Sequence, residues 1–575
     1  MKMDNCRLST VFNRLKKSSS DSIDNTEKFD EFKNYMHVTR AAESDLKGIL
    51  RLVKDSGKKT LVLLCGSAGD GKSHLLSYLK NADEEHLIDG YKIFNDATES
   101  SAPSKTAIQT LNELLSSFKD ANLEEPGQNV ILAINLGVLS NFIESEYKSE
   151  YSLLRKYVEK TNILTTKINM NDYDENSHFQ HVSFSDYHMY GLTENGVHAG
   201  YIEDIFSKVF SDSEDNIFYH AYKDNCSECP LGNKCPVKMN YEFMSSEDRR
   251  KYVAGILVKT IIKDKTILTT REILNFIYNI VVSQDFSYTK YQAMQADEAL
   301  YLREYMKHIT PSLLFDSTDV AVLMNMLTKY DPLLMRSEKA DELAISYYVS
   351  SDISDNIIDA FSSSPYKQVL CDENMMKRIS LDRVLKSAVF NLIVREKAID
   401  GNTESDEIYR SYLKDLFSYN AGQGKKLGNL YGMIEKAVTQ WCGSDEDDNL
   451  CLDNKHTGFS VYESVEFEEN LDFIPKSTGD AELQRFIPSV IASFTGNKGE
   501  IISLDIDYAL YELLYRLNKG YIQTADDRNN HADFISFVDR ILQTGNLNKQ
   551  VTVMMPNGKK ATISSGKFGY KFKVV

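Results

Sequence analysis

Eight consecutive residues, from Gly66 to Ser73, have the types and spacing of a phosphate-binding loop. Their sequence, GSAGDGKS, matches the pattern G-x-x-x-x-G-K-[ST]. In such a loop the backbone N–H groups surround the nucleotide phosphates, the lysine contacts the β- and γ-phosphates, and the final hydroxyl binds Mg²⁺. We therefore predict that Lys72 and Ser73 bind ATP and Mg²⁺. The predicted nucleotide-binding residues are Gly66, Ser67, Ala68, Gly69, Asp70, Gly71, Lys72, Ser73 and His74.

The segments on either side of this loop support the prediction. Residues 61–65 form an apolar run of strand length, and Leu75, Leu76 and Leu79 recur at helical spacing after the loop. A strand, a glycine-rich turn and a helix N-terminus together create a site for an anion. The alternative is a chance match in a tight strand-to-helix turn, which the agreement of the loop with its flanking elements disfavours.

Hydrolysis of ATP also requires a carboxylate near Mg²⁺ and a group that positions water. No apolar strand candidate ends in Asp-Asp or Asp-Glu, and the run 131–135 ends in Asn135 instead. One interpretation makes Asn135 a sensor of the γ-phosphate or of the water, while Asp96 and Glu99, after the preceding strand, supply the carboxylates. The other interpretation is a weakened enzyme that binds ATP as a switch. A turn or helix cap is the structural alternative for Asp96.

Arg271 lies in the first turn of a predicted helix, which Thr269 and Glu272 begin with a capping-box pattern. In the AAA+ class of ATPases, a helical lid carries an arginine in this setting, called sensor 2, which contacts the γ-phosphate. Arg271 resembles that arginine and would couple the nucleotide state to the position of the lid. The alternative is a solvated surface arginine. The apolar residues expected to face a core are Ile273, Leu274, Ile277, Ile280 and Val281.

Cys226, Cys229 and Cys235 lie within ten residues, in the pattern C-x-x-C-P-x-x-x-x-C-P. Two thiolates at C-x-x-C spacing can hold one metal from a single turn, so we expect a structural zinc site with His220 as the nearest fourth ligand. Cysteine-proline pairs also occur at iron–sulfur sites, and three local ligands do not choose between the metals. A reduced, buried cluster without metal is the alternative. Remote choices for the fourth ligand are Cys371, Cys442 and Cys451.

Strands that alternate with helices predict a mainly parallel sheet covered on both faces. The expected fold class is α/β: a P-loop NTPase (AAA+-like) domain, then a mostly helical lid, then a C-terminal region with a β-hairpin at 551–563. Asn557 and Gly558 mark the hairpin turn. The predicted domains are an N-terminal leader (1–40), the ATPase domain (41–250) with a cysteine-knuckle insertion near 220–240, the lid (251–345), a helical region (346–480) and a C-terminal α+β domain (481–575).

The net charge of −18 excludes binding of nucleic acid through a general basic field, so a local surface or a partner must supply any DNA contact. Alternating Lys and aromatic residues near the C-terminus suit a nucleic-acid backbone, but protection of an exposed strand edge is the favoured explanation. No run of about 18 apolar residues predicts a membrane span. Eight cysteines are too few for a disulfide scaffold in 575 residues, which predicts a cytoplasmic protein.

Taken together, several segments resemble the DptF family, the F subunit of DNA phosphorothioation-dependent restriction systems. The matching segments are LLCGSAGDGKSHLL, FNDATES, ILAINLGVLSNF, CSECPLGNKCPVKMNY and IDYALYELLYRLNKGY. The resemblance implies a bacterial role in phage defence, in which F, G and H subunits restrict DNA that lacks a sulfur mark in its backbone. The residues described above contain no nuclease constellation, so we assign this chain the nucleotide-driven part of the process.

Two functions follow from these observations. The first is an ATPase whose nucleotide cycle drives a DNA-restriction assembly. The second is a nucleotide-gated scaffold that binds ATP with little turnover and recruits partner subunits. The expected partners are subunits of the G and H type, DNA bound directly or through them, and a second copy of this chain. A small-molecule kinase is a weaker alternative, because the helical tail and the cysteine knuckle exceed what phosphotransfer requires.

Overall fold

The computed structural model describes residues 6–574 apart from several gaps, among them 67–69 and 96–105. The predicted site residues Ser67, Ala68, Gly69, Asp96 and Glu99 therefore lie outside the described residues. The remaining gaps are 22–30, 165–171, 319, 336–337, 402–405, 446–448, 454–457, 464, 466–467, 477–478, 497–498, 545–550 and 567–568. The chain divides into two compact units, one comprising 1–190 and 199–404 and the other 191–198 and 405–575.

The first unit is built around a four-stranded sheet in the order β2-β3-β1-β4. Its strands are β1 (Leu61–Cys65), β2 (Lys92–Phe94), β3 (Val130–Ile134) and β4 (Phe179–Ser183). All three pairings are parallel, and Leu61 lies opposite both Val130 and Phe179. Every residue of β1 and β3 is buried, which explains why both strands are continuous apolar runs without polar alternation. The predicted parallel sheet is confirmed.

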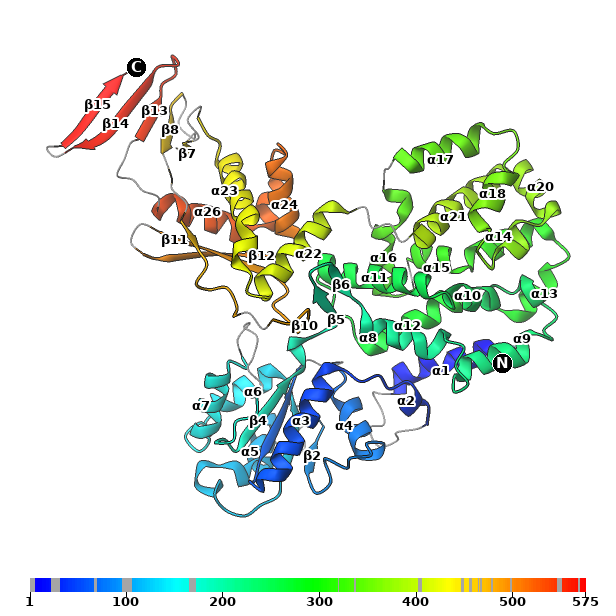
Figure 1. Ribbon diagram of the computed structural model, residues 1–575, viewed down its shortest axis with the longest axis horizontal. Helices are drawn as coiled ribbons and strands as arrows, with labels where there is room; N and C mark the ends of the chain where they lie inside the picture. The colour runs from blue at the N-terminus through cyan, green and yellow to red at the C-terminus, as the bar shows by residue number, and fades with distance from the viewer. Residues whose placement is uncertain are drawn as a thin grey trace. The chain divides into compact units, whose positions relative to one another are not determined.

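Helices cover both faces of this sheet (Figure 1). They are α3 (Ala41–Ser56) and α4 (Lys72–Asn81) on one face, and α5 (Ala107–Leu114), α6 (Leu136–Ile143) and α7 (Ser152–Thr161) on the other. Successive side chains of a strand point to opposite faces. Accordingly, Leu63 joins the core beneath α5, α6 and α7, whereas Val62 and Leu64 join the core beneath α3 and α4.

The N-terminal residues contribute α1 (Arg7–Asp21) and α2 (Glu31–Tyr35). The sequence predicted an N-terminal leader at 1–40. Instead, Leu8, Phe12 and Leu15 of α1 are buried, and the helix packs against α9 and α12. Phe12 lies 5.1 Å from the ring of Phe218, centroid to centroid. Helix α1 is thus part of the first unit's core.

From α8 on, the first unit is helical, and two buried arginines contact carboxyl groups of other helices. Its helices are α8 (Gly200–Phe210), α9 (Ile217–Cys226), α10 (Pro236–Met244), α11 (Glu247–Asp264), α12 (Thr270–Val281), α13 (Tyr288–Met294), α14 (Glu298–Lys307), α15 (Thr310–Asp316), α16 (Val322–Leu327), α17 (Glu338–Val349), α18 (Ser354–Phe361), α19 (Lys367–Leu370), α20 (Glu373–Leu381) and α21 (Arg383–Gly401). Arg249 donates to Asp400 at 2.7 Å and lies 3.4 Å from Glu396. Arg395 pairs with Asp316 and Asp331. These pairs connect helices far apart in sequence.

The second unit combines antiparallel sheets with helices. It includes the last three residues of β5 (Tyr187–Thr193). Its other strands are β6 (Gly196–His198), β7 (Leu450–Asp453), β8 (Ser460–Glu463), β9 (Glu469–Asn470), β10 (Glu482–Arg485), β11 (Val490–Thr495), β12 (Ile501–Ile506), β13 (Val551–Met554), β14 (Lys560–Gly566) and β15 (Gly569–Val574). Its helices are α22 (Glu407–Asn420), α23 (Gly428–Cys442), α24 (Tyr508–Asn518), α25 (Ala525–Asn530) and α26 (Ala532–Thr544). The strands form three sheets, in the orders β10-β5-β6, β12-β11-β9 and β15-β14-β13-β8-β7.

Two predictions can be compared directly with this second unit. The hairpin at 551–563 is confirmed, because β13 and β14 pair antiparallel with Val551 opposite Ile563. The spacing of apolar residues over 505–517 also predicts a helix, and this helix begins later, at Tyr508. Residues 501–506 form β12, and the Asp507 carboxylate accepts the N–H of Leu510 at 2.8 Å as the helix cap. Strand pairing and the cap therefore move the helix start three residues along the chain.

Candidate nucleotide-binding site

The phosphate loop connects the carboxyl end of β1 to the first residue of α4, as the sequence predicts. The N–H of Gly66 donates to the carbonyl of Ile134 at 3.2 Å, so the loop leaves the sheet directly beside β3. Gly71 has φ +93° and precedes Lys72, the first residue of α4. Ligands of parallel α/β sheets bind outside the carboxyl ends of the strands, and helix N-termini favour anions. This position suits a nucleotide phosphate.

Lys72 is turned back over the loop. Its Nζ donates to the carbonyl oxygen of Gly66 at 2.9 Å. A side chain at Gly66 would be crowded, because an added Cβ would lie 2.6 Å from Asp70 Oδ2 and 3.0 Å from Phe184 Cβ. The charged groups of the motif thus converge on its first glycine, and the motif's glycine requirement has a steric cause here.

Asn135 lies at the end of β3, next to the phosphate loop. The pairing of Cys65 with Ile134 places it there. Its Oδ1 accepts the N–H of Val138 at 2.7 Å and caps α6. The capping role occupies the side-chain oxygen, so the amide NH₂ is the group with chemistry to offer a phosphate or a water. The sequence predicted a sensor at this position without predicting the cap.

The predicted carboxylates Asp96 and Glu99 follow β2 and lie outside the described residues. Strand β2 pairs with β3 up to the match of Phe94 with Leu132. Its carboxyl end therefore lies on the same edge of the sheet as the phosphate loop, with β3 in between. The role of both carboxylates remains a prediction.

Asp186 is a carboxylate that the sequence analysis did not single out for this site. It follows β4, the other neighbour of β1, in a short 3₁₀ turn. The pKa of the Cys65 thiol is raised to about 12, chiefly by burial; the charge of Lys72 lowers it and that of Asp186 raises it further. Both charges thus act on Cys65 at the end of β1. A carboxylate three residues after a strand was the available sequence signal.

Arg40 is a second residue that sequence patterns did not indicate. It precedes α3, and its Nη1 donates to the carbonyl of Asp70 at 2.8 Å, while Nη2 donates to the carbonyl of Tyr187 at 3.3 Å. Its guanidinium carbon lies 5.3 Å from the centroid of the Tyr201 ring. Arg40 therefore connects the phosphate loop to the segments after β4, a role without a local sequence signature.

Helix α12 begins with the predicted capping box, since Thr269 and Glu272 exchange the expected hydrogen bonds. Arg271 is half-buried in its first turn. The hydroxyls of Thr270 and Tyr201 are 2.8 Å apart. The described contacts thus run from the start of α12 through Tyr201 and Arg40 to the phosphate loop. The predicted contact of Arg271 with a γ-phosphate stays a prediction.

His74, the last predicted nucleotide-binding residue, is engaged by a neighbouring histidine. The His37 Nδ1 lies 3.2 Å from the His74 Nε2. The His37 ring stacks on Tyr78 with centroids 3.6 Å apart, and its Nε2 lies 3.0 Å from the Glu43 carboxylate. His37 thus bridges α3 and α4, the two helices beside the phosphate loop.

The three knuckle cysteines lie at the junction of α9 and α10. Cys226 ends α9, Cys235 precedes α10, and both are buried. Together with Cys229 they line a pocket of about 370 Å³. The predicted fourth ligand, His220, is not among the residues that line this pocket, and its Nε2 lies 2.6 Å from the carbonyl oxygen of Glu214. Within the described part of the chain, no group of three or more His, Cys, Asp or Glu has the arrangement to hold a single metal ion.

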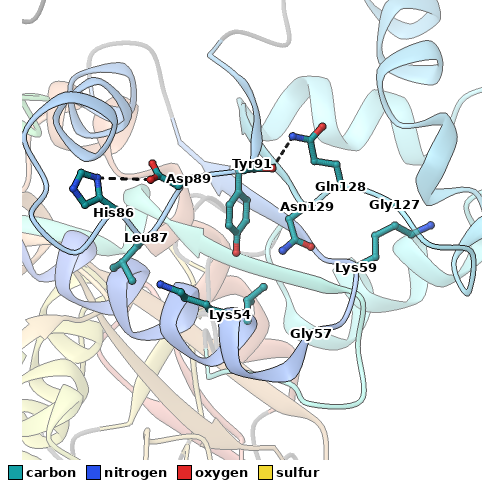
Figure 2. Close-up of a pocket in the computed structure, with 12 residues that line it drawn as sticks. Lys54, Gly57, Lys59, His86, Leu87, Asp89, Tyr91, Gly127, Gln128 and Asn129 are labelled. Carbon is teal, nitrogen blue, oxygen red and sulfur yellow. Dashed lines mark hydrogen bonds and ion pairs between the residues drawn. The ribbon is translucent and has the colours of Figure 1, made fainter.

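A larger pocket, of about 470 Å³, lies at the amino ends of the strands of the four-stranded sheet (Figure 2). Lys59, Tyr91 and Asn129, which line it, precede β1, β2 and β3. Lys59 Nζ donates to the backbone carbonyls of Ser117 and Asn122. Because nucleotides bind at the carboxyl ends of such strands, this amino-end pocket is separate from the candidate site.

The chain matches no protein-family model, no curated protein and no solved structure. Among the described residues, no helix combines the length and the apolar character needed to cross a bilayer. Evidence for function therefore comes from the geometry of the phosphate loop and from the sequence motifs.

Proposed function

We propose that this chain is a P-loop, AAA+-like ATPase subunit that hydrolyses ATP to ADP and phosphate within a DNA phosphorothioation-dependent restriction assembly. One observation carries the nucleotide part. The complete motif connects β1 to α4 at the carboxyl edge of a parallel sheet, with Lys72 held over Gly66. The restriction part rests on the resemblance to the DptF family. Its partners are then subunits of the G and H type, and DNA contacted directly or through them.

The residues around the loop divide into groups with different tasks. Lys72 neutralises charge on the β- and γ-phosphates, and Ser73 holds Mg²⁺. Asp96 or Glu99 binds the metal or positions the water. Asp186, which follows β4 on the other side of β1, is the alternative among the described residues. The NH₂ of Asn135 donates to the γ-phosphate or to the attacking water. No step of this scheme requires a group from the second unit.

Coupling to the rest of the chain runs through the start of α12. A γ-phosphate attracts Arg271 in the first turn, and Thr270, Tyr201 and Arg40 connect that turn to the loop. Loss of the γ-phosphate on hydrolysis removes this attraction. The helical lid would then change its position with each cycle.

A nucleotide-gated scaffold is the second candidate function. One observation favours it: the β3 end next to Gly66 carries Asn135 in place of an acid, and the side-chain oxygen of Asn135 is already used to cap α6. Under this alternative, bound ATP orders the lid and recruits partner subunits or a second copy of the chain, with little turnover.

ATP binding and hydrolysis by the purified chain test these functions, each measured with Mg²⁺ and with or without duplex DNA. Lys72→Ala should abolish both activities. Lys80→Ala, an exposed lysine at the end of the same helix, is the matched control and should change neither. Binding without turnover under every condition would reject the ATPase in favour of the scaffold. Equal binding by wild type and Lys72→Ala would reject both.

A further inference from the structure

Four of the eight cysteines surround one pocket, although one of them is remote in sequence from the other three. Cys6 lines the same pocket as Cys226, Cys229 and Cys235. Cys6 immediately precedes α1. The structure thus brings a fourth thiol to the knuckle where sequence spacing supplied only three.

The position of Cys6 is set by packing on both sides. Arg7 Nη1 donates to the side-chain oxygen of Asn225 at 3.1 Å, which holds the start of α1 against the end of α9. One turn further, the buried Phe12 contacts the rings of Phe218 and Tyr241, at centroid distances of 5.1 and 6.2 Å. The packing of α1 in this core therefore places Cys6 beside Cys226, Cys229 and Cys235.

Burial raises the pKa of the Cys226 and Cys235 thiols above the ordinary value, and Lys238 offsets part of this effect. Cys235 directly precedes the N-terminus of α10. The Lys238 side chain also lines the pocket. Helix N-termini, N–H donors and nearby cations stabilise cysteine thiolates, and such donors tune the sulfur ligands of metal sites.

The number of thiols and the size of the pocket favour a cluster over a single ion. A structural zinc ion needs its four sulfurs at about 2.3 Å from one point. No three of the described Cys, His, Asp or Glu side chains are placed in that way. A [4Fe–4S] cluster is larger than a single ion and binds one cysteine on each of its four irons. Its four cysteine sulfurs are therefore farther apart than the sulfurs around one ion. The pocket of about 370 Å³ provides space for such a cluster.

We propose that Cys6, Cys226, Cys229 and Cys235 ligate one [4Fe–4S] cluster. Each thiol loses its proton to water or to the departing ligand and replaces one terminal thiolate ligand of a cluster preassembled on a carrier, so one Fe–S bond forms as another breaks, and no electron is transferred in this step. The cluster clamps the start of α1 to the junction of α9 and α10. Because α1 also packs against α12, the clamp supports the helix that follows the phosphate-loop domain. The proposal does not depend on ATP hydrolysis.

Metal and sulfide analysis of the full-length chain, purified without oxygen, tests this proposal. We expect about four iron and about four acid-labile sulfide atoms per chain, with visible charge-transfer absorption. Cys6→Ser and Cys229→Ser should lose most of the iron. The control Cys371→Ser replaces a half-buried cysteine outside the pocket and should keep it. Circular dichroism and thermal melting of each variant report whether the chain is folded.

Each outcome decides one part of the proposal. One zinc per chain without iron would overturn the cluster in favour of a single ion. Full iron content in a folded Cys6→Ser variant would overturn Cys6 as a ligand. Absence of iron and zinc from a folded wild-type chain would overturn the metal centre altogether. Limited proteolysis gives a second readout, since loss of iron should expose the 7–21 segment to cleavage while the 61–81 segment stays protected.

Discussion

Arg40 donates a hydrogen bond from Nη1 to the carbonyl oxygen of Asp70 at 2.8 Å, and this bond ties the residue before α3 to the phosphate loop. The same guanidinium reaches the carbonyl of Tyr187. Arg40 is therefore a positioning residue, which holds the loop by its backbone.

Replacing Arg40 should disturb nucleotide binding without unfolding the sheet. We expect Arg40→Gln to weaken ATP binding about 10-fold, or about 1.4 kcal/mol, because the loop loses its guanidinium support. Arg40→Lys should restore only part of the loss, since an ammonium lacks the two-armed geometry. Titration with ATP checks this, and Arg51→Gln, which removes an exposed arginine paired with Glu85, is the control. Unchanged affinity in Arg40→Gln would contradict the positioning role.

Two substitutions separate the cap of Asn135 from its proposed catalytic role. Asn135→Asp keeps the capping oxygen and removes the NH₂ donor, so stability should hold while turnover falls. Asn135→Ala removes both and should also lower the free energy of unfolding by about 1 kcal/mol. Thermal melts and ATPase rates measure the two effects. Equal turnover in wild type and Asn135→Asp would restrict Asn135 to the cap.

Tyr201→Phe tests the connection between α12 and the loop. The variant keeps the ring beside Arg40 and removes the hydroxyl that contacts Thr270. We expect a stability loss of about 1 kcal/mol, together with a weaker effect of ATP on amide exchange in α12. Amide exchange with and without nucleotide measures this coupling. If ATP protects α12 equally in both proteins, the lid is coupled by another route.

The raised pKa of the buried Glu396 carboxyl predicts how the free energy of unfolding depends on pH. Burial raises the pKa of this carboxyl to about 8, and the charge of Arg249 offsets only part of the effect. The folded chain therefore holds a proton that the unfolded chain releases near pH 4.5, so this group makes stability fall as the pH rises towards 8. Glu396→Gln should remove that dependence and gain at least about 1 kcal/mol at pH 8.

Urea unfolding at pH 5 and pH 8 measures the effect. Glu407→Gln, at an exposed glutamate of α22, is the control and should follow wild type at both values. A loss of stability in Glu396→Gln at pH 8 would show that the pair with Arg249 outweighs the burial of the carboxylate.

Local chemistry made part of this protein predictable from sequence. The strands β1 and β3 are apolar runs, the capping box of Thr269 and Glu272 involves residues three apart, and the 551–563 hairpin closes over a short loop. The phosphate-loop motif likewise lies in eight consecutive residues. In each case the interacting groups are close in sequence, so spacing and residue type are sufficient.

Tertiary structure alone decided the rest. The contact of Arg40 with Asp70, the meeting of Tyr201 with Thr270, and the approach of Cys6 to Cys226 join residues that are 30 or more positions apart. No periodicity encodes such contacts, because they depend on how separate helices pack on shared apolar cores. The sequence by itself determined the nucleotide-loop motif and its flanking strand and helix. Packing determined which carboxylates, arginines and cysteines surround the two proposed sites.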